Sequence, residues 1–398
     1  MPTSSGPNTS GENSLAFAYD VADARNSYIG EPTTNLANFD IASSAVAFNS
    51  DTPGNVTQTA SSTEATYRGR LSRKMVVGAG YWNAYIYGYN TGVSSAVFAV
   101  SYKVKTADGS HPNTIIGGGY IYGSAGSFFP TPTFTYLSDG WYLATMLYAG
   151  SSMVLNSLTG MNGSGGPKTF YIVDYQAEAK DHSTPFAGVA GTRSNTQGLL
   201  DLTRNNTINL SNVSFNSSAQ ILFDGTDDRI AVGNLGTIGN SYSIECVFYS
   251  TSVQSYRNTY DMNYSTYNPN TGNVGPRLEQ VSNGTFNWIW SGNTTNNSLY
   301  NATTPTSISA NTYYHTVFAL SSGFVNTYKN GVLIDSNVSS PQGYITSFGD
   351  VSIGRGFILD PSRYFAGIIP ILKIYNRALS SFEVANNYNA YKKRFNLS

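Results

Sequence analysis

The chain has 398 residues and a formal net charge of −1, and only 11% of its residues are charged, where a soluble domain usually carries about 25%. It has no basic excess for neutralising phosphates, no run of about 18 apolar residues for crossing a membrane, and only one cysteine, which excludes an intramolecular disulfide framework. We therefore expect neither nucleic acid nor a membrane as a partner. The length suggests two or three domains, each large enough for its own core.

Short runs of β-branched and aromatic residues, separated by Gly, Asn, Ser and Asp, predict an all-β chain. In chain order we expect strands at 81–89, 96–104, 140–148, 170–175, 242–249, 313–320 and 351–354. The run 242–249 alternates with period two, which places Cys246 on the inner face of its strand as a small hydrophobe. Asn330-Gly331 predicts a type I′ hairpin turn, because this turn needs positive φ at both central residues.

One helix is predicted, at the C-terminal end. Ser380 and Glu383 form a capping-box pattern, and Phe382, Ala385 and Tyr388 then recur at helical spacing. Basic residues at 392–394 fall near the helix C-terminus, where they offset the dipole. We expect this helix to pack on the outside of a sheet.

Four segments of the second half resemble the concanavalin A-like, or laminin-G-like, jelly roll. They are Phe-Asp-Gly-Thr-Asp-Asp-Arg-Ile at 223–230, Ser-Ile-Glu-Cys-Val-Phe at 243–248, Tyr-Lys-Asn-Gly-Val-Leu at 328–333, and 365–380 with Glu383 and Val384. The match is close to a variant in structural proteins of tailed bacteriophages, especially marine, cyanophage-like ones. In the first half, 171–186 and 191–194 resemble a signature that closes a carbohydrate-binding-module-like sandwich in similar phage proteins.

The resemblance implies an all-β fold of two antiparallel β-sandwiches, one carbohydrate-binding-module-like and one a concanavalin A-like jelly roll, with one short C-terminal helix. Residues 15–20 and 26–30 resemble the first strand of the jelly roll, although they lie far upstream. We therefore expect an N-terminal arm with that strand at 1–34, a sandwich at 35–190 inserted after it, and the jelly roll at 191–398. An insertion of this kind is inexpensive, because each doubling of a loop costs only about 0.6 kcal/mol.

Four tryptophans are candidate sugar-stacking platforms: Trp82, Trp141, Trp288 and Trp290. Trp288 and Trp290 share one face of a strand, and in a sandwich such a pair more often belongs to the core. A row of tyrosines on one face, at Tyr81, Tyr85, Tyr87 and Tyr89, favours a wet subunit interface over a sugar surface.

Asp224, Asp227 and Asp228 form a compact acidic cluster. It is a candidate Ca²⁺ site, since hard cations prefer oxygen ligands. An Asp-Gly turn with capping carboxylates is the favoured explanation of the same residues. We therefore expect no obligatory cofactor, with Ca²⁺ as the alternative.

The sequence offers little for catalysis. Glucanases of this fold pair two carboxylates on one strand face, whereas Glu178, Glu245, Glu279 and Glu383 each stand alone. The three histidines, His111, His182 and His315, have no accompanying nucleophile motif and no set of zinc ligands. We therefore expect a protein without enzymatic activity.

The resemblance implies a non-enzymatic virion structural protein: a capsid decoration, head fibre or tail-fibre component. We expect it on the virion surface after assembly in the host cytoplasm, with other virion proteins and copies of itself as partners. A glycan-binding adhesin or lectin is the alternative, compatible with a place on the virion, and a glycoside hydrolase is a third.

Overall fold

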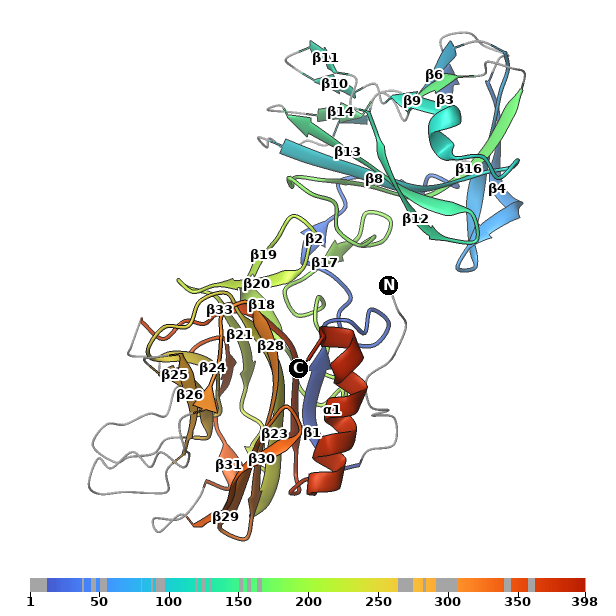
Figure 1. Ribbon diagram of the computed structural model, residues 1–398. Coiled ribbons are helices and arrows are strands. Elements are labelled where there is room, and N and C mark those ends of the chain that lie inside the picture. Colours follow the sequence, from blue (N-terminus) through green and yellow to red (C-terminus); the bar gives the residue numbers. More distant parts are fainter. Residues whose placement is uncertain are drawn as a thin grey trace. The chain divides into compact units, whose positions relative to one another are not determined.

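The computed structural model divides into two compact units (Figure 1). Unit 1 comprises residues 1–31, 194–216 and 220–398, and unit 2 comprises 32–193 and 217–219. The structure describes residues 13–37, 39–43, 48–50, 56–79, 81–86, 89–90, 97–118, 121–123, 126–128, 131–149, 153–155, 159–162, 167–263, 275–281, 284–290, 306–339, 345–356 and 362–397. Within these ranges no helix is both long and apolar enough to cross a membrane.

Unit 1 contains two large antiparallel sheets. The first has the order β19-β20-β33-β23-β28-β29-β30, with β1 also paired to β33. Its strands are β1 (Leu15–Asp20), β19 (Ser214–Phe215), β20 (Ile221–Asp224), β23 (Ser241–Ser250), β28 (Thr312–Ser321), β29 (Phe324–Lys329), β30 (Val332–Ser339) and β33 (Ala366–Tyr375).

The second sheet has the order β18-β21-β32-β24-β25-β26-β27. Its strands are β18 (Asn209–Asn212), β21 (Arg229–Gly233), β24 (Arg257–Asp261), β25 (Arg277–Val281), β26 (Thr285–Ile289), β27 (Thr306–Ser307) and β32 (Val351–Ile353). A two-stranded sheet is formed by β22 (Gly236–Thr237), which follows β21 in the sequence, and β31 (Ser347–Phe348), which precedes β32.

The core of unit 1 lies between the two large sheets. In β23 every second side chain from Tyr242 to Phe248 enters one apolar cluster, and Cys246 is fully buried there, as the alternation predicts. Phe286 of the second sheet meets Phe248 of the first edge to face, with ring centroids 6.1 Å apart. The unit is therefore an antiparallel β-sandwich stabilised mainly by apolar burial.

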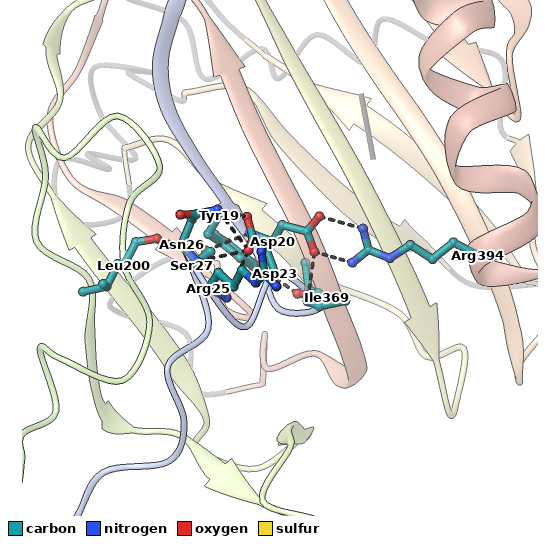
Figure 2. A network of polar contacts seen from close by, with 10 residues as sticks. Tyr19, Asp20, Asp23, Arg25, Asn26, Ser27, Leu200, Ile369 and Arg394 are labelled. Carbon is teal, nitrogen blue, oxygen red and sulfur yellow. Dashed lines mark hydrogen bonds and ion pairs between the residues drawn. The ribbon is translucent and has the colours of Figure 1, made fainter. Parts of the chain in front are cut away.

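The first strand of this sandwich comes from the start of the described chain. In β1, Leu15 to Asp20 pair with Tyr375 to Ile371 of β33, while β23 occupies the other edge of β33. Ser27 accepts a hydrogen bond from the Asp20 amide and donates one to the Leu200 carbonyl (Figure 2). The chain thus leaves unit 1 after residue 31 and returns to it at residue 194.

Helix α1 (Ser381–Phe395) closes the chain, and its capping box is present as predicted. The Ser380 hydroxyl accepts from the Glu383 amide, and the Glu383 carboxylate accepts from the Ser380 amide. Tyr391 packs in a cluster with Val247 and Ile371, whose side chains point away from the sandwich core. The helix therefore covers the outer face of the first sheet, which confirms its expected position (Figure 1).

Unit 2 contains a six-stranded sheet of order β12-β13-β8-β16-β5-β4, two four-stranded sheets and a short pair. The six strands are β4 (Val56–Tyr67), β5 (Arg70–Val77), β8 (Val97–Thr106), β12 (Thr133–Ser138), β13 (Trp141–Ala149) and β16 (Lys168–Glu178). One four-stranded sheet has the order β3 (Phe48–Ser50), β6 (Tyr81–Ile86), β15 (Thr159–Asn162) and β9 (Ile116–Gly118). The other has the order β11 (Gly126–Phe128), β10 (Ile121–Gly123), β14 (Met153–Leu155) and β7 (Tyr89–Asn90). The pair is β2 (Thr33–Thr34) with β17 (Thr192–Arg193), and a 3₁₀ turn spans Pro112–Thr114.

The predicted local elements agree with this all-β architecture. The hairpin at Asn330-Gly331 has φ values of +49° and +77°, as a type I′ turn requires. The strand expected at 81–89 ends at Ile86, and β7 begins at Tyr89. The side chains of the tyrosine row at 81–89 lie outside the description of the structure. Residues 1–12, which make up most of the expected N-terminal arm, lie outside the described residues.

Candidate functional site

A polar cleft of about 630 Å³ opens in unit 1. Three segments form it: the 211–214 stretch that links the two sheets, the turn between β20 and β21, and the segment that precedes β33. Its lining is Ser211, Asn212, Val213, Ser214, Asp227, Asp228, Arg229, Arg355 and Tyr364. The volume lies within the usual range of ligand sites, about 300–1,000 Å³.

The first wall is the acidic turn singled out in the sequence. Asp224 accepts backbone hydrogen bonds at Oδ1 from Thr226 (2.7 Å) and Asp227 (3.4 Å). Asp228 accepts at Oδ2 from the Asp224 amide (2.6 Å) and at Oδ1 from the Ser214 amide (2.8 Å). The Asp224 carboxylate therefore forms an Asx turn. The Asp228 carboxylate closes the turn from its other end and ties it to Ser214.

The three aspartates also lie close together. One carboxylate oxygen from each can be chosen so that all lie within 4.8 Å of one another. The pKa of Asp228 is raised, mainly because its carboxylate is buried and also because the Asp224 charge is close by. The hydrogen bonds from the Asp224 and Ser214 residues act in the opposite direction. A cation bound here would share oxygens that already accept N–H groups, so Ca²⁺ binding at this turn stays a prediction.

The second wall comes from the segment before β33. The Arg355 guanidinium lies 4.4 Å above the centre of the Tyr364 ring, and the two residues also form a backbone bridge. Stacking of this kind holds the guanidinium plane in one orientation. This wall therefore presents a positioned donor group next to a phenol.

Arg257 joins the two walls. Its Nη1 donates to the carbonyl of Gly225 in the acidic turn and, over 2.5 Å, to the carbonyl of Tyr364. A single guanidinium thus fixes both sides of the cleft at their backbones.

An ion network lies behind the second wall. Glu279 Oε2 accepts from Arg277 Nε (3.0 Å) and from Arg363 Nη1 (2.6 Å), and the carboxylate is 4% exposed. Burial lowers the pKa of Arg277, opposed by the charges of Glu279 and Asp261. The network holds Arg363, and with it the neighbouring Tyr364, against β25.

The sequence patterns did not point to the other residues of the site, which are Arg257, Arg277, Arg355, Arg363 and Tyr364. The alternation of charged Arg277 and Glu279 with apolar Leu278 in β25 was the available signal, since it indicates a polar face on that strand.

The tryptophan platforms require a correction. Trp288 and Trp290 are 1% and 2% exposed and belong to the sandwich core, so they present no ring face to a sugar. Trp141 is 2% exposed and packs edge to face on Tyr67 in unit 2. The side chain of Trp82 lies outside the described residues.

The isolated glutamates and histidines have structural partners. Glu178 accepts hydrogen bonds from Thr33 and Thr184, and Glu245 is bound by Tyr375 and His315. Within the described chain, no Glu or His lines the cleft.

The comparisons with known proteins agree with this fold. Residues 224–385 match the family described as the concanavalin A-like lectin/glucanases superfamily, so the second half contains a concanavalin A-like, laminin-G-like jelly roll. No curated protein matches the chain.

Three solved structures illustrate the likeness. Domain 4 of AbnA, a GH43 extracellular arabinanase from Geobacillus stearothermophilus, in complex with arabinotriose, has 19% identity and a TM-score of 0.34, over 42% of this chain and 75% of that chain. The receptor-binding domain of botulinum neurotoxin C/D mosaic serotype has 16% identity and a TM-score of 0.38, over 49% of each chain. The botulinum neurotoxin serotype D ligand-binding domain in complex with N-acetylneuraminic acid has 15% identity and a TM-score of 0.37, over 50% of this chain and 49% of that chain. The chain thus spans about half the length of the botulinum domains that it matches.

Proposed function

We propose that unit 1 is a non-catalytic glycan-binding module whose cleft holds the sugar. The observation that carries this proposal is the chemistry of the lining, where carboxylate, guanidinium, amide and hydroxyl groups converge on one opening. Sugars present adjacent hydroxyls that both donate and accept, and this set supplies partners of both kinds.

The construction of the cleft supports the proposal. Arg257 ties both walls together, and the Glu279–Arg363 pair supports the wall that carries Tyr364. A site already held in shape loses less conformational entropy when a ligand binds.

The positions of the carboxylates favour binding over hydrolysis. Glycosidases flank the scissile bond with two carboxyl groups about 5–10 Å apart, one of them a proton donor. Here the lining carboxylates are Asp227 and Asp228, consecutive residues of one turn, and Asp228 already accepts two backbone N–H groups. The cleft therefore has no carboxylate on its opposite, described wall.

A glycan array probed with the full chain tests the proposal. We expect a defined set of glycans to bind and Asp227→Asn to weaken that binding at least tenfold. Asp139→Asn, at another exposed aspartate in unit 2, should leave the binding unchanged. Incubation of each bound glycan with the protein should release no reducing ends. Absence of any glycan ligand, or equal effects of the two variants, would contradict the proposal.

We also propose a place for this module on the surface of a tailed-phage virion, as a capsid decoration, head fibre or tail-fibre component that contacts itself and other virion proteins. The sequence resemblance at 171–194 and 365–384 supports it. Electron microscopy of antibody-labelled particles should show label on the head or on the tail fibres. Particles without label would count against the proposal.

A further inference from the structure

A second charged surface lies in unit 2, on the outer face of the six-stranded sheet. In β8, Val100, Tyr102 and Val104 enter the core of the unit, so Lys103 and Lys105 alternate onto the opposite face. The hairpin between β4 and β5 adds two arginines to this face. We call Arg68, Arg70, Lys103 and Lys105 the basic cluster.

The turn of this hairpin places Arg68 at a position with positive φ. Tyr67 pairs with Arg70, and the two residues between them, Arg68 and Gly69, have φ values of +49° and +80°. A two-residue turn of this kind favours Asn, Asp or Gly at its first central position. Arginine there costs about 1 kcal/mol of backbone strain, and residues that break a local rule in this way mark candidate functional sites.

A second strained residue lies inside the basic cluster. Asp174 has φ of +57° within a bulge of β16, and bulges commonly re-aim a side chain. Its carboxylate, 5% exposed, lies 2.7 Å from Arg70 Nε and 2.6 Å from Lys103 Nζ. The Asp174 carboxylate thus pairs with two of the four cations. Neither Arg68 nor Lys105 forms an ion pair with any carboxylate in the described part of the chain.

Aromatic rings fix three of these cations. Arg70 lies 4.7 Å from the centre of the Phe186 ring, Lys103 lies 5.0 Å from that of Tyr67, and Arg68 lies 5.4 Å from that of Tyr67. Burial lowers the pKa of Lys103, and the positive charges of Arg70 and Arg68 lower it further. The Asp174 carboxylate has the opposite effect and raises this pKa. A further anion at this position would relieve that repulsion.

We propose that the basic cluster binds the carboxylate or sulfate groups of an acidic polysaccharide, independently of the cleft in unit 1. Planar guanidinium groups match such groups with two parallel hydrogen bonds. Nucleic acid fits less well, because DNA carries one charge per about 1.7 Å and this cluster surrounds a single point. The rings of Tyr67 and Phe186 are also covered by cations, so they offer no stacking platform for bases.

Titrations of the full chain test the proposal with dextran sulfate and alginate as acidic probes and neutral dextran as the matched uncharged polymer. We expect both acidic polymers to bind and dextran not to bind. The double variant Arg68→Gln/Lys105→Gln spares the Asp174 ion pairs and should weaken binding at least tenfold, with a shallower dependence on salt. The control Lys392→Gln/Lys393→Gln removes the same charge from helix α1 and should bind like the unmodified protein.

Three outcomes would overturn the proposal: no binding of either acidic polymer, equal weakening by the two double variants, or tighter binding of single-stranded DNA of matched charge. Melting temperatures of both double variants show that unit 2 remains folded. Asp227→Asn separates this site from the unit 1 cleft, because it should leave dextran sulfate binding unchanged.

Discussion

Asp20 in β1 and Arg394 in helix α1 form a two-pronged ion pair across 374 positions of the sequence (Figure 2). Both side chains are only 11% exposed. The pair fastens the end of the helix to the strand that the chain contributes before it enters unit 2. The sheet, its first strand and its covering helix are thereby held as one body.

Replacing Asp20 by Asn should destabilise unit 1 by about 3 kcal/mol, because it leaves the Arg394 guanidinium poorly paired and mostly buried. Thermal unfolding at neutral pH measures this loss. Arg25→Gln removes a nearby exposed cation and serves as the control, for which we expect almost no shift. Similar melting temperatures for the two variants would show that the pair contributes little.

Alanine substitutions at Gly354 and Gly233 distinguish the cost of steric overlap from the cost of backbone strain. Both have φ near +85°, but a Cβ at Gly354 would lie 2.2 Å from Phe223 Cε1, whereas one at Gly233 would meet nothing within 4 Å. Gly233→Ala should cost about 1 kcal/mol, from strain alone, and Gly354→Ala at least about 2 kcal/mol more. Denaturant titrations of both variants measure the difference, and equal midpoints would refute the assigned contact.

The C-terminal helix should lose stability as the pH falls into the acid range. The Arg377 guanidinium and the Ser380 N-cap hydrogen bonds lower the pKa of Glu383 to about 2. Because the folded pKa lies below the unfolded one, the stabilisation is complete above about pH 5 and disappears as the pH falls toward 2. The difference in melting temperature between the unmodified protein and Glu383→Gln should shrink over that interval. A difference independent of pH would contradict this assignment.

The Cys246 thiol should not react with thiol reagents in the folded protein. The thiol is fully buried, and burial raises its pKa, so little thiolate forms at neutral pH. Ellman's reagent at pH 8 should detect no thiol until denaturant is added, and then one per chain, since the chain has a single cysteine. Rapid reaction of the native protein would show that the core opens readily.

Several elements could be predicted from the sequence because they depend on residues that are close together in the chain. The Asn330-Gly331 turn and the Ser380–Glu383 capping box depend on residues within four positions of each other. Alternation likewise assigned Cys246 to the inner face of its strand. For Trp288 and Trp290 the pattern defined a shared face but not whether that face was covered.

The cleft was not readable in this way. Asp228, Arg257 and Tyr364 meet because strands distant in sequence are neighbours in the sheets, and hydrophobic alternation does not encode strand order. The same holds for Asp174, whose position depends on a bulge. Residue types identified the acidic turn, whereas only the fold placed Arg355 and Tyr364 opposite it.

Hydrogen–deuterium exchange of the full chain, with and without an array-selected neutral glycan, locates the bound sugar without any substitution. We expect slower exchange at 211–214, 224–229 and 362–364 in unit 1, with exchange in unit 2 unchanged. Unchanged exchange in these segments, with protection elsewhere in the chain, would contradict the assignment of the cleft as the glycan site.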